Sequence, residues 1–263
     1  MIKLIVTDLD GTLLTDDRTL PEDFDEVLEK LVKMDVIFCA ASGRSWYTIK
    51  KLFRNNCEKI FYISDNGAYL TDGKDYEEVN FALTKKQSEA VVDECLKIDG
   101  LQVIMCAKDR AYFVSPDSKY LNIINEYYIN YEIVDDYRKI EEQILKIAVY
   151  DPEGSALNGY PKIKDKLEKE LVAVVSANNW FDIMNKNVNK GVAVRKIQAH
   201  FGITRAETMA FGDFNNDIEM LKEAEYSFAM ANSNDSVKSA ANYEAESNNN
   251  FGVTKAIKKI CRQ

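Results

Sequence analysis

The sequence of 263 residues is short of several residue types and patterns, and each shortage excludes a class of protein. It contains one histidine, which excludes a metal site built from several histidines. Basic residues are outnumbered by acidic ones, and the net charge is −9. A broad nucleic-acid-binding surface needs a basic stripe, so no nucleic-acid partner is expected. The anion of a small substrate could still be held in a locally positive pocket.

Long apolar runs are also missing. No run of about 18 or more apolar residues occurs, so no membrane-spanning segment and no membrane partner are expected. Lys3 interrupts the only N-terminal segment that could resemble the apolar core of a signal sequence. We therefore expect a cytoplasmic location.

Cysteines are few and follow no paired pattern. Their odd number and the lack of any CxxC spacing favour reduced, buried thiols over disulfides or a zinc site. The one histidine, His200, lies in an apparent helix, where a structural role is expected. The cysteines are Cys39, Cys57, Cys95, Cys106 and Cys261.

The N-terminal segment is the most informative part of the chain. Residues 3–7 have the pattern of a short buried strand, and Asp8, Asp10 and Gly11 follow. Ligands of open α/β sheets bind at the carboxyl ends of strands, and side chains two apart on an extended backbone point the same way. Two close like charges need a shared cation or proton. The pair predicts a hard metal ion, a shifted pKa or both, although a solvated turn would use the same residue types.

The first part of the chain alternates strands and helices, which predicts a parallel sheet with right-handed crossovers. Thr19 and Glu22 have the spacing of a capping box ahead of a helix that includes Phe24–Leu31. The other expected elements are strands at 36–41 and 60–64 and a helix at about 46–54.

The middle of the chain predicts a separate α+β unit, and the α/β pattern then returns. In the last part, Gly202 has the position of a helix C-cap, and Asn216 is expected to cap the helix at 217–222. The middle elements are helices at 84–98, 118–128 and 160–170 and strands at 102–107, 111–115, 144–150 and 171–176. The late elements are helices at 190–201 and 253–260 and strands at 208–211 and 226–230.

Polar groups follow several of the predicted strands and form a chemically specific set. Asp8 and Asp213 offer oxygen atoms to a hard cation such as Mg²⁺, which needs few carboxylates. Ser42 and Gly43, with the N-terminus of the helix after them, suit an anion, and Lys190 adds a positive charge. An aspartate beside a cation and an anion site is suited to attack phosphorus.

These segments together resemble the haloacid dehalogenase superfamily of phosphohydrolases, and in detail its Cof-type subfamily. The match extends over nearly the whole chain. The segments similar to the four superfamily motifs are Asp8–Leu14, Ala41–Arg44, Lys190–Gly191 and Gly212–Asp217. The segments similar to the subfamily are Ser64–Ala68, Phe228–Asn232 and Asn250–Val253.

The resemblance implies an α/β fold with two domains. A Rossmann-like parallel sheet with helices on both faces is expected for residues 1–81 and 186–263. The segment between Asp10 and Ser42 is too short for an inserted domain, whereas the segment between Arg44 and Lys190 is long enough. An inserted α+β cap that sets substrate specificity is therefore expected at 82–185.

The resemblance also implies catalytic and metal-binding roles. Asp8 would be the nucleophile and a Mg²⁺ ligand. Asp10 would be the general acid and base, and its backbone carbonyl would contact Mg²⁺. Asp213 would complete the metal ligands that the protein supplies.

By the same resemblance, a second set of residues would hold the phosphate. Asp217 would orient Lys190 or a metal-bound water from behind, and Thr12 would support the site. Arg44 would reach the substrate or pair nearby. The phosphate-binding groups would be the backbone N–H groups of Leu9 and Gly43 and the side chains of Ser42, Lys190 and Asn216.

The function implied is a Mg²⁺-dependent phosphatase of small phosphorylated metabolites that forms an aspartyl-phosphate. Sugar phosphates are the favoured substrates, with flavin mononucleotide and pyridoxal phosphate as alternatives. The only expected partner is a small phosphate ester, and the protein is expected to be a monomer or a weak homodimer. The alternatives are a phosphomutase, a receiver-like signalling domain and a ligand-binding regulator without catalysis.

Overall fold

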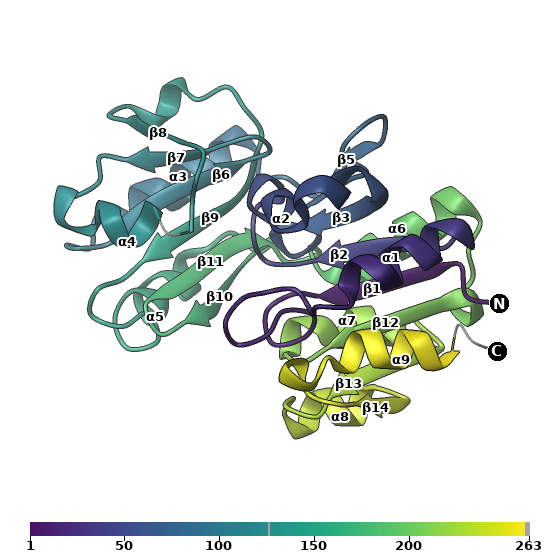
Figure 1. The fold of residues 1–263 in the computed structure, drawn as a ribbon. Helices are drawn as coiled ribbons and strands as arrows, with labels where there is room; N and C mark the ends of the chain where they lie inside the picture. Colours follow the sequence, from purple (N-terminus) through teal and green to yellow (C-terminus); the bar gives the residue numbers. More distant parts are fainter. Residues whose placement is uncertain (126, 261–263) are drawn as a thin grey trace. The chain divides into compact units, whose positions relative to one another are not determined.

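The computed structural model describes residues 1–125 and 127–260 (Figure 1). The chain divides into two compact units. The first consists of Met1–Gly43, Ile49–Glu78 and Asn189–Gln263, and the second of Arg44–Thr48 and Val79–Val188. Among the residues described, no helix combines the length and the apolar character that crossing a membrane would need.

The first unit is built on an eight-stranded sheet. The strands are β1 (Leu4–Asp8), β2 (Ile37–Ala41), β3 (Ile60–Ser64), β4 (Tyr69–Thr71), β5 (Glu77–Val79), β12 (Thr208–Gly212), β13 (Tyr226–Met230) and β14 (Tyr243–Ala245). Their order is β14-β13-β12-β1-β2-β3-β4-β5. The pairs from β14 to β3 are all parallel, and β4 is antiparallel to β3.

Strand β1 is central in this sheet, and all five of its residues are buried. Its side chains alternate between two apolar clusters, because Ile5 belongs to one and Leu4 and Val6 to the other. A strand with a core on each face has a continuous apolar run, which explains why residues 3–7 predict it so well.

Helices cover both faces of the first sheet, as predicted for this fold class. The helices α1 and α9 share one apolar cluster with the sheet, and α6, α7 and α8 share the other. The N-terminal α1 and the C-terminal α9 lie side by side (Figure 1). The bounds are α1 (Phe24–Lys33), α2 (Trp46–Phe53), α6 (Lys190–Phe201), α7 (Ile218–Lys222), α8 (Asp235–Ala240) and α9 (Gly252–Ile260).

The second unit has a six-stranded sheet in the order β10-β11-β9-β6-β7-β8, antiparallel except for the parallel pair β7 and β8. Helices α3 and α5 pack on one face, and α4 packs on the other. The strands are β6 (Gln102–Ala107), β7 (Ala111–Val114), β8 (Tyr131–Val134), β9 (Ile144–Tyr150), β10 (Leu171–Ala177) and β11 (Trp180–Asn185). The helices are α3 (Lys85–Cys95), α4 (Leu121–Asn125) and α5 (Gly159–Ile163).

Two predicted helix caps are wrong. Thr19 does not start a helix, because its N–H donates to the Thr15 hydroxyl at 3.3 Å in a turn and α1 begins only at Phe24. Asn216 does not cap the next helix, because its side chain donates to Asn66 instead. In both cases a tertiary or turn hydrogen bond replaces the local one that the spacing predicted.

Several elements differ in length from their predicted bounds or were not predicted. The helix predicted at 118–128 is a 3₁₀ turn followed by α4, and position 126 lies outside the described residues. The helix predicted at 160–170 is α5 and a 3₁₀ turn. The strands β4, β5, β8 and β14 are only three or four residues long, too short for a clear periodic pattern. In β11 the buried Asp182 interrupts the apolar run.

The described cysteines form no disulfide with one another, and three of the four are buried, as predicted. Cys39 and Cys95 are buried free thiols, and Cys57 is half-buried. Cys106 is buried and its thiol donates to the Tyr128 hydroxyl at 3.7 Å. Cys261 lies outside the described residues.

Helix α6 ends as predicted at Gly202, which has φ +63° and open space where a side chain would begin. We expect Gly202→Ala to lower the free energy of unfolding by about 1 kcal/mol, because an alanine in the left-handed region is strained. Gly202→Asn is the matched control and should cost less, since asparagine tolerates this conformation. Urea unfolding measures both, and equal losses would contradict the backbone explanation.

Candidate active site

A buried lysine between two carboxylates lies at the centre of the candidate site. Asp8 ends the central strand β1 and is 7% exposed, and Lys190 begins α6 and is fully buried. The Lys190 ammonium donates to Asp8 Oδ1 and to Asp217 Oδ1, the latter at 2.6 Å. Asn189 caps α6 by accepting from the Val192 N–H at 2.9 Å, which sets where the helix begins. A buried charge needs such partners.

Asp217 uses both of its carboxylate oxygens in structural contacts. One oxygen accepts from Lys190, and the other accepts from the backbone N–H groups of Asp213 and Phe214 at 3.0 and 3.1 Å. A Cβ on Gly212 would lie 2.4 Å from the Cβ of Asp217, so this approach requires glycine. Asp217 therefore connects Lys190 to the turn that contains Asp213 and fixes the position of one relative to the other.

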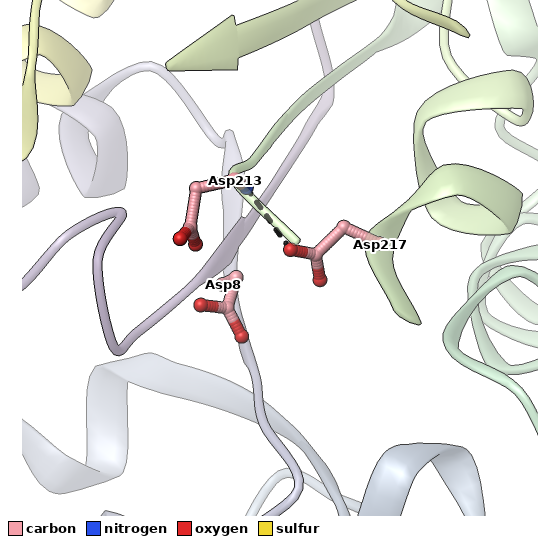
Figure 2. A group of neighbouring side chains, drawn as sticks. All are labelled: Asp8, Asp213 and Asp217. Carbon is pink, nitrogen blue, oxygen red and sulfur yellow. Dashed lines mark hydrogen bonds between the residues drawn. The ribbon is translucent and has the colours of Figure 1, made fainter. Parts of the chain in front are cut away.

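Asp213 reaches the same place from the end of β12. Its Oδ1 accepts from the Thr12 hydroxyl at 2.7 Å. Gly11 has φ +77°, and a Cβ there would lie 2.4 Å from Asp213 Oδ2. Figure 2 shows the carboxylates of Asp8, Asp213 and Asp217 around one small volume, and each offers an oxygen within 4.8 Å of the others.

The pKa values reflect burial and an excess of negative charge. Burial raises the pKa of Asp8 well above its usual value; Lys190 opposes this, and Asp217 and Asp213 add to it. Burial also raises the pKa of Asp213 to about 6, against the hydrogen bond from Thr12. Burial alone would lower the pKa of Lys190, but the two neighbouring carboxylates outweigh burial and raise it.

This donor set fits a divalent cation. Three carboxylates face one ammonium, so the group carries uncompensated negative charge, and its atoms are the oxygens that Mg²⁺ prefers. Because both oxygens of Asp217 are already engaged, Asp8 and Asp213 are the better candidate ligands.

A second cluster lies at the ends of β2 and β3. The Ser42 N–H donates to the Ile63 carbonyl at 2.9 Å, and the Asn66 N–H donates to the Ser42 carbonyl at 3.0 Å. The Asn216 amide donates to Asn66 Oδ1 at 3.1 Å. Ser42 is buried, whereas Asn216 is exposed. The structure thus joins the Ser42 turn to Asn216 through Asn66.

Asn66 lies in the subfamily-like segment Ser64–Ala68, but the sequence analysis assigned it no role in the site. Asp65, Asn66 and Gly67 have consecutive φ values of 49°, 58° and 105°, and strained backbone of this kind concentrates at functional sites. A Cβ on Gly67 would lie 2.5 Å from the Asn189 carbonyl, so this turn lies against the start of α6. The Asp-Asn-Gly sequence was the available signal, because these residues tolerate positive φ.

The remaining predicted residues lie in different surroundings. The Leu9 carbonyl accepts from the N–H groups of Thr12 and Leu14, and Leu9 is fully buried. Asp10 is exposed and forms a parallel bridge with Leu14. Gly43 follows Ser42, and a Cβ there would lie 3.1 Å from Asn66 Oδ1. Arg44 belongs to the second compact unit, whereas Leu9, Asp10 and Gly43 belong to the first.

The family of the chain follows from comparison with known proteins. A family model for haloacid dehalogenase-like hydrolases matches residues 5–257. The chain belongs to this family. The curated proteins similar to this chain include the Escherichia coli K12 5-amino-6-(5-phospho-D-ribitylamino)uracil phosphatase YbjI. YbjI and this chain are 31% identical, and the match covers 99% of this chain and 97% of YbjI.

Solved structures of other proteins have the same fold as this chain. SMU.1108c from Streptococcus mutans UA159 superposes with a TM-score of 0.86 at 26% identity, over all of both chains. The subclass IIB sugar phosphatase BT4131 superposes with a TM-score of 0.79 at 25% identity, over 98% of this chain and 99% of that one. The family membership and the named phosphatases among the relatives make this chain an enzyme of the phosphoric monoester hydrolase class.

The raised pKa of Asp213 predicts a pH-dependent effect of Asp213→Asn on stability. A carboxyl whose pKa is raised on folding stabilises the protein below its ordinary pKa of about 3.9, and this contribution is lost as pH rises through about 6. In EDTA, the asparagine variant should unfold at higher urea concentration than wild type well above pH 6, and the difference should shrink towards pH 4.

Magnesium provides the control for this prediction. Wild type should gain stability on addition of Mg²⁺, whereas Asp213→Asn should gain little, since one carboxylate ligand is missing. A variant that is less stable than wild type in EDTA at high pH would contradict the assignment of buried negative charge to Asp213.

Proposed function

We propose that the protein is a Mg²⁺-dependent phosphatase that hydrolyses small phosphorylated metabolites through an aspartyl-phosphate on Asp8. One observation carries the proposal: Asp8 and Asp213, 205 positions apart, offer oxygens within 4.8 Å beside the buried Lys190. A nucleophile needs neighbouring positive charge when it approaches a phosphate dianion. The Lys190 ammonium supplies one positive charge, and the Asp8 and Asp213 oxygens offer a place for a metal ion that would supply a second.

Asp8, Asp213 and the backbone carbonyl of Asp10 would hold the metal ion. When bound, Mg²⁺ neutralises charge on the phosphoryl oxygens and helps to orient the ester. Lys190 holds a carboxylate oxygen of Asp8 in place and contributes positive charge. Asp217 keeps that ammonium in position from the opposite side.

The chemistry proceeds in two displacements. A carboxylate oxygen of Asp8 attacks phosphorus, the ester P–O bond breaks, and Asp10 gives a proton to the departing alcohol oxygen. Asp10 then takes a proton from water, the water oxygen attacks phosphorus, and the acyl-phosphate P–O bond breaks to release inorganic phosphate and regenerate Asp8. Ser42, Asn216 and the N–H groups of Leu9 and Gly43 are proposed to hold the phosphoryl oxygens.

The division of the rate enhancement follows from general chemistry. Phosphate monoester hydrolysis is accelerated by enzymes by up to ~10²¹-fold. General acid–base catalysis by Asp10 supplies about 10²- to 10⁴-fold of this. Positioning and charge stabilisation must therefore supply most of the remainder.

Sugar phosphates and related polyhydroxylated phosphate esters are the proposed substrates. Two relatives support this class, since one is named for a phosphorylated ribityl compound and another as a sugar phosphatase. Residues 82–185 are proposed to act as the cap that selects the leaving group. A turnover screen over phosphorylated sugars, flavin mononucleotide and pyridoxal phosphate tests the substrate class.

Asp8→Asn should lower turnover of p-nitrophenyl phosphate by about 10³-fold or more, because the amide is not a nucleophile. Trapping of ³²P-labelled aspartyl-phosphate should be lost as well, while far-UV circular dichroism stays unchanged. Asp235→Asn makes the same exchange at an exposed residue of α8 and should keep wild-type turnover. Turnover near the wild-type rate in Asp8→Asn would remove Asp8 from its role.

Removal of divalent metal should abolish turnover of p-nitrophenyl phosphate. Excess EDTA leaves the carboxylates without the counter-charge that they need to accept a phosphate dianion. Titration with Mg²⁺ should restore activity in wild type, and Asp213→Asn should require a much higher Mg²⁺ concentration. Full activity in EDTA would refute the metal dependence.

A further inference from the structure

The loop after β1 carries Asp10, the proposed acid and base, and hydrogen bonds hold it both from within and from distant segments of the chain. We name residues 9–16 the β1 loop. Within it, the Leu9 carbonyl accepts from the N–H groups of Leu14 at 2.8 Å and Thr12 at 3.3 Å. The Thr12 hydroxyl donates to Asp213 on the inner side. A further contact reaches the loop at Gly11, which follows the exposed Asp10.

Asparagines from the far end of the chain supply this contact and others. The Asn232 amide donates to the Gly11 carbonyl at 2.8 Å. The Asn248 N–H donates to Asn232 Oδ1 at 3.2 Å, and the Asn248 amide donates to the Leu14 carbonyl at 3.0 Å. These bonds form a continuous connection between two carbonyls of the β1 loop.

A second set of bonds continues along the loop. The Asn248 amide also donates to Asp16 Oδ1 at 2.9 Å, and the Asn249 amide donates to Asp16 Oδ2 at 2.8 Å. The Asp16 N–H donates back to Asn249 Oδ1 at 3.0 Å. The bonds span more than 200 positions of sequence, so they form only when the C-terminal strands have joined the sheet.

Amide side chains suit this position for an electrostatic reason. An asparagine both donates and accepts, and it has no charge to add to the carboxylates of the site. The asparagine amide also does not titrate. Asn248 is 2% exposed, and its hydrogen bonds avoid the cost of an unsatisfied buried amide.

We propose that Asn232 and Asn248 are positioning residues, an amide clamp that holds the Gly11–Thr12 peptide beside Asp10 so that Asp10 can protonate the leaving alcohol. The clamp rests on the proposed function, because it acts through Asp10. It predicts that loss of the clamp impairs departure of a leaving group that needs a proton far more than departure of one that does not.

Two substrates of similar shape separate these cases. The p-nitrophenolate leaving group of p-nitrophenyl phosphate departs without a proton, whereas the alkoxide of p-nitrobenzyl phosphate needs one. Asn232→Leu should lower kcat/KM by about 10- to 100-fold for p-nitrobenzyl phosphate and by less than about 3-fold for p-nitrophenyl phosphate. This parameter covers the steps through release of the alcohol, and the ratio of the two values cancels any loss of folded enzyme.

Asn242→Leu is the matched control. Asn242 is an exposed asparagine of the same unit whose amide also donates to a backbone carbonyl at 2.8 Å, that of Glu225. Its replacement should leave the ratio of the two kcat/KM values unchanged. Asn232→Ser provides a second test of the clamp if the leucine variant does not fold.

Equal losses on the two substrates, or an unchanged ratio in both Asn232 variants, would overturn the clamp. The failure of the proposed function looks different: wild type would then hydrolyse neither ester, or Asp8→Asn would retain activity. In the expected case, wild type hydrolyses both esters and Asn232→Leu selectively loses p-nitrobenzyl phosphate.

Discussion

The buried ammonium of Lys190 is the contact on which the rest of the site depends. It is fully buried and touches the carboxylates of Asp8 and Asp217, which come from opposite ends of the chain. An isolated buried charge costs several kcal/mol, and breaking such a pair leaves that cost uncompensated. The start of α6, the end of β1 and the turn after β12 are therefore constrained together.

Glycines permit the close contacts that this arrangement needs. Gly11 and Gly212 lie where a Cβ would collide with the carboxylates of Asp213 and Asp217, and Gly67 lies where a Cβ would collide with the backbone before Lys190. The cluster that results contains three carboxylates and one ammonium, so acidic groups outnumber basic ones. This donor set fits the divalent cation and the nucleophile of the proposed function.

Much of the fold was predictable from local pattern. The residues of β1 and β3 and the end of α6 at Gly202 were predicted closely, because continuous apolar runs and a C-terminal glycine are strong local signals. The site residues were named through motif resemblance, and the structure brings Asp8, Lys190, Asp213 and Asp217 together. Their roles in catalysis stay proposals.

The sequence by itself determined which elements alternate, which family the motifs resemble and which carboxylates follow buried strands, because these depend on neighbours along the chain. Only the tertiary structure decided that the Asn216 amide donates to Asn66 instead of capping a helix. It also decided that the Asn232 amide donates to the Gly11 carbonyl. Asparagine carries a donor and an acceptor that suit many partners equally well. Its partner is therefore chosen by the fold, when segments distant in sequence meet at one edge of the sheet.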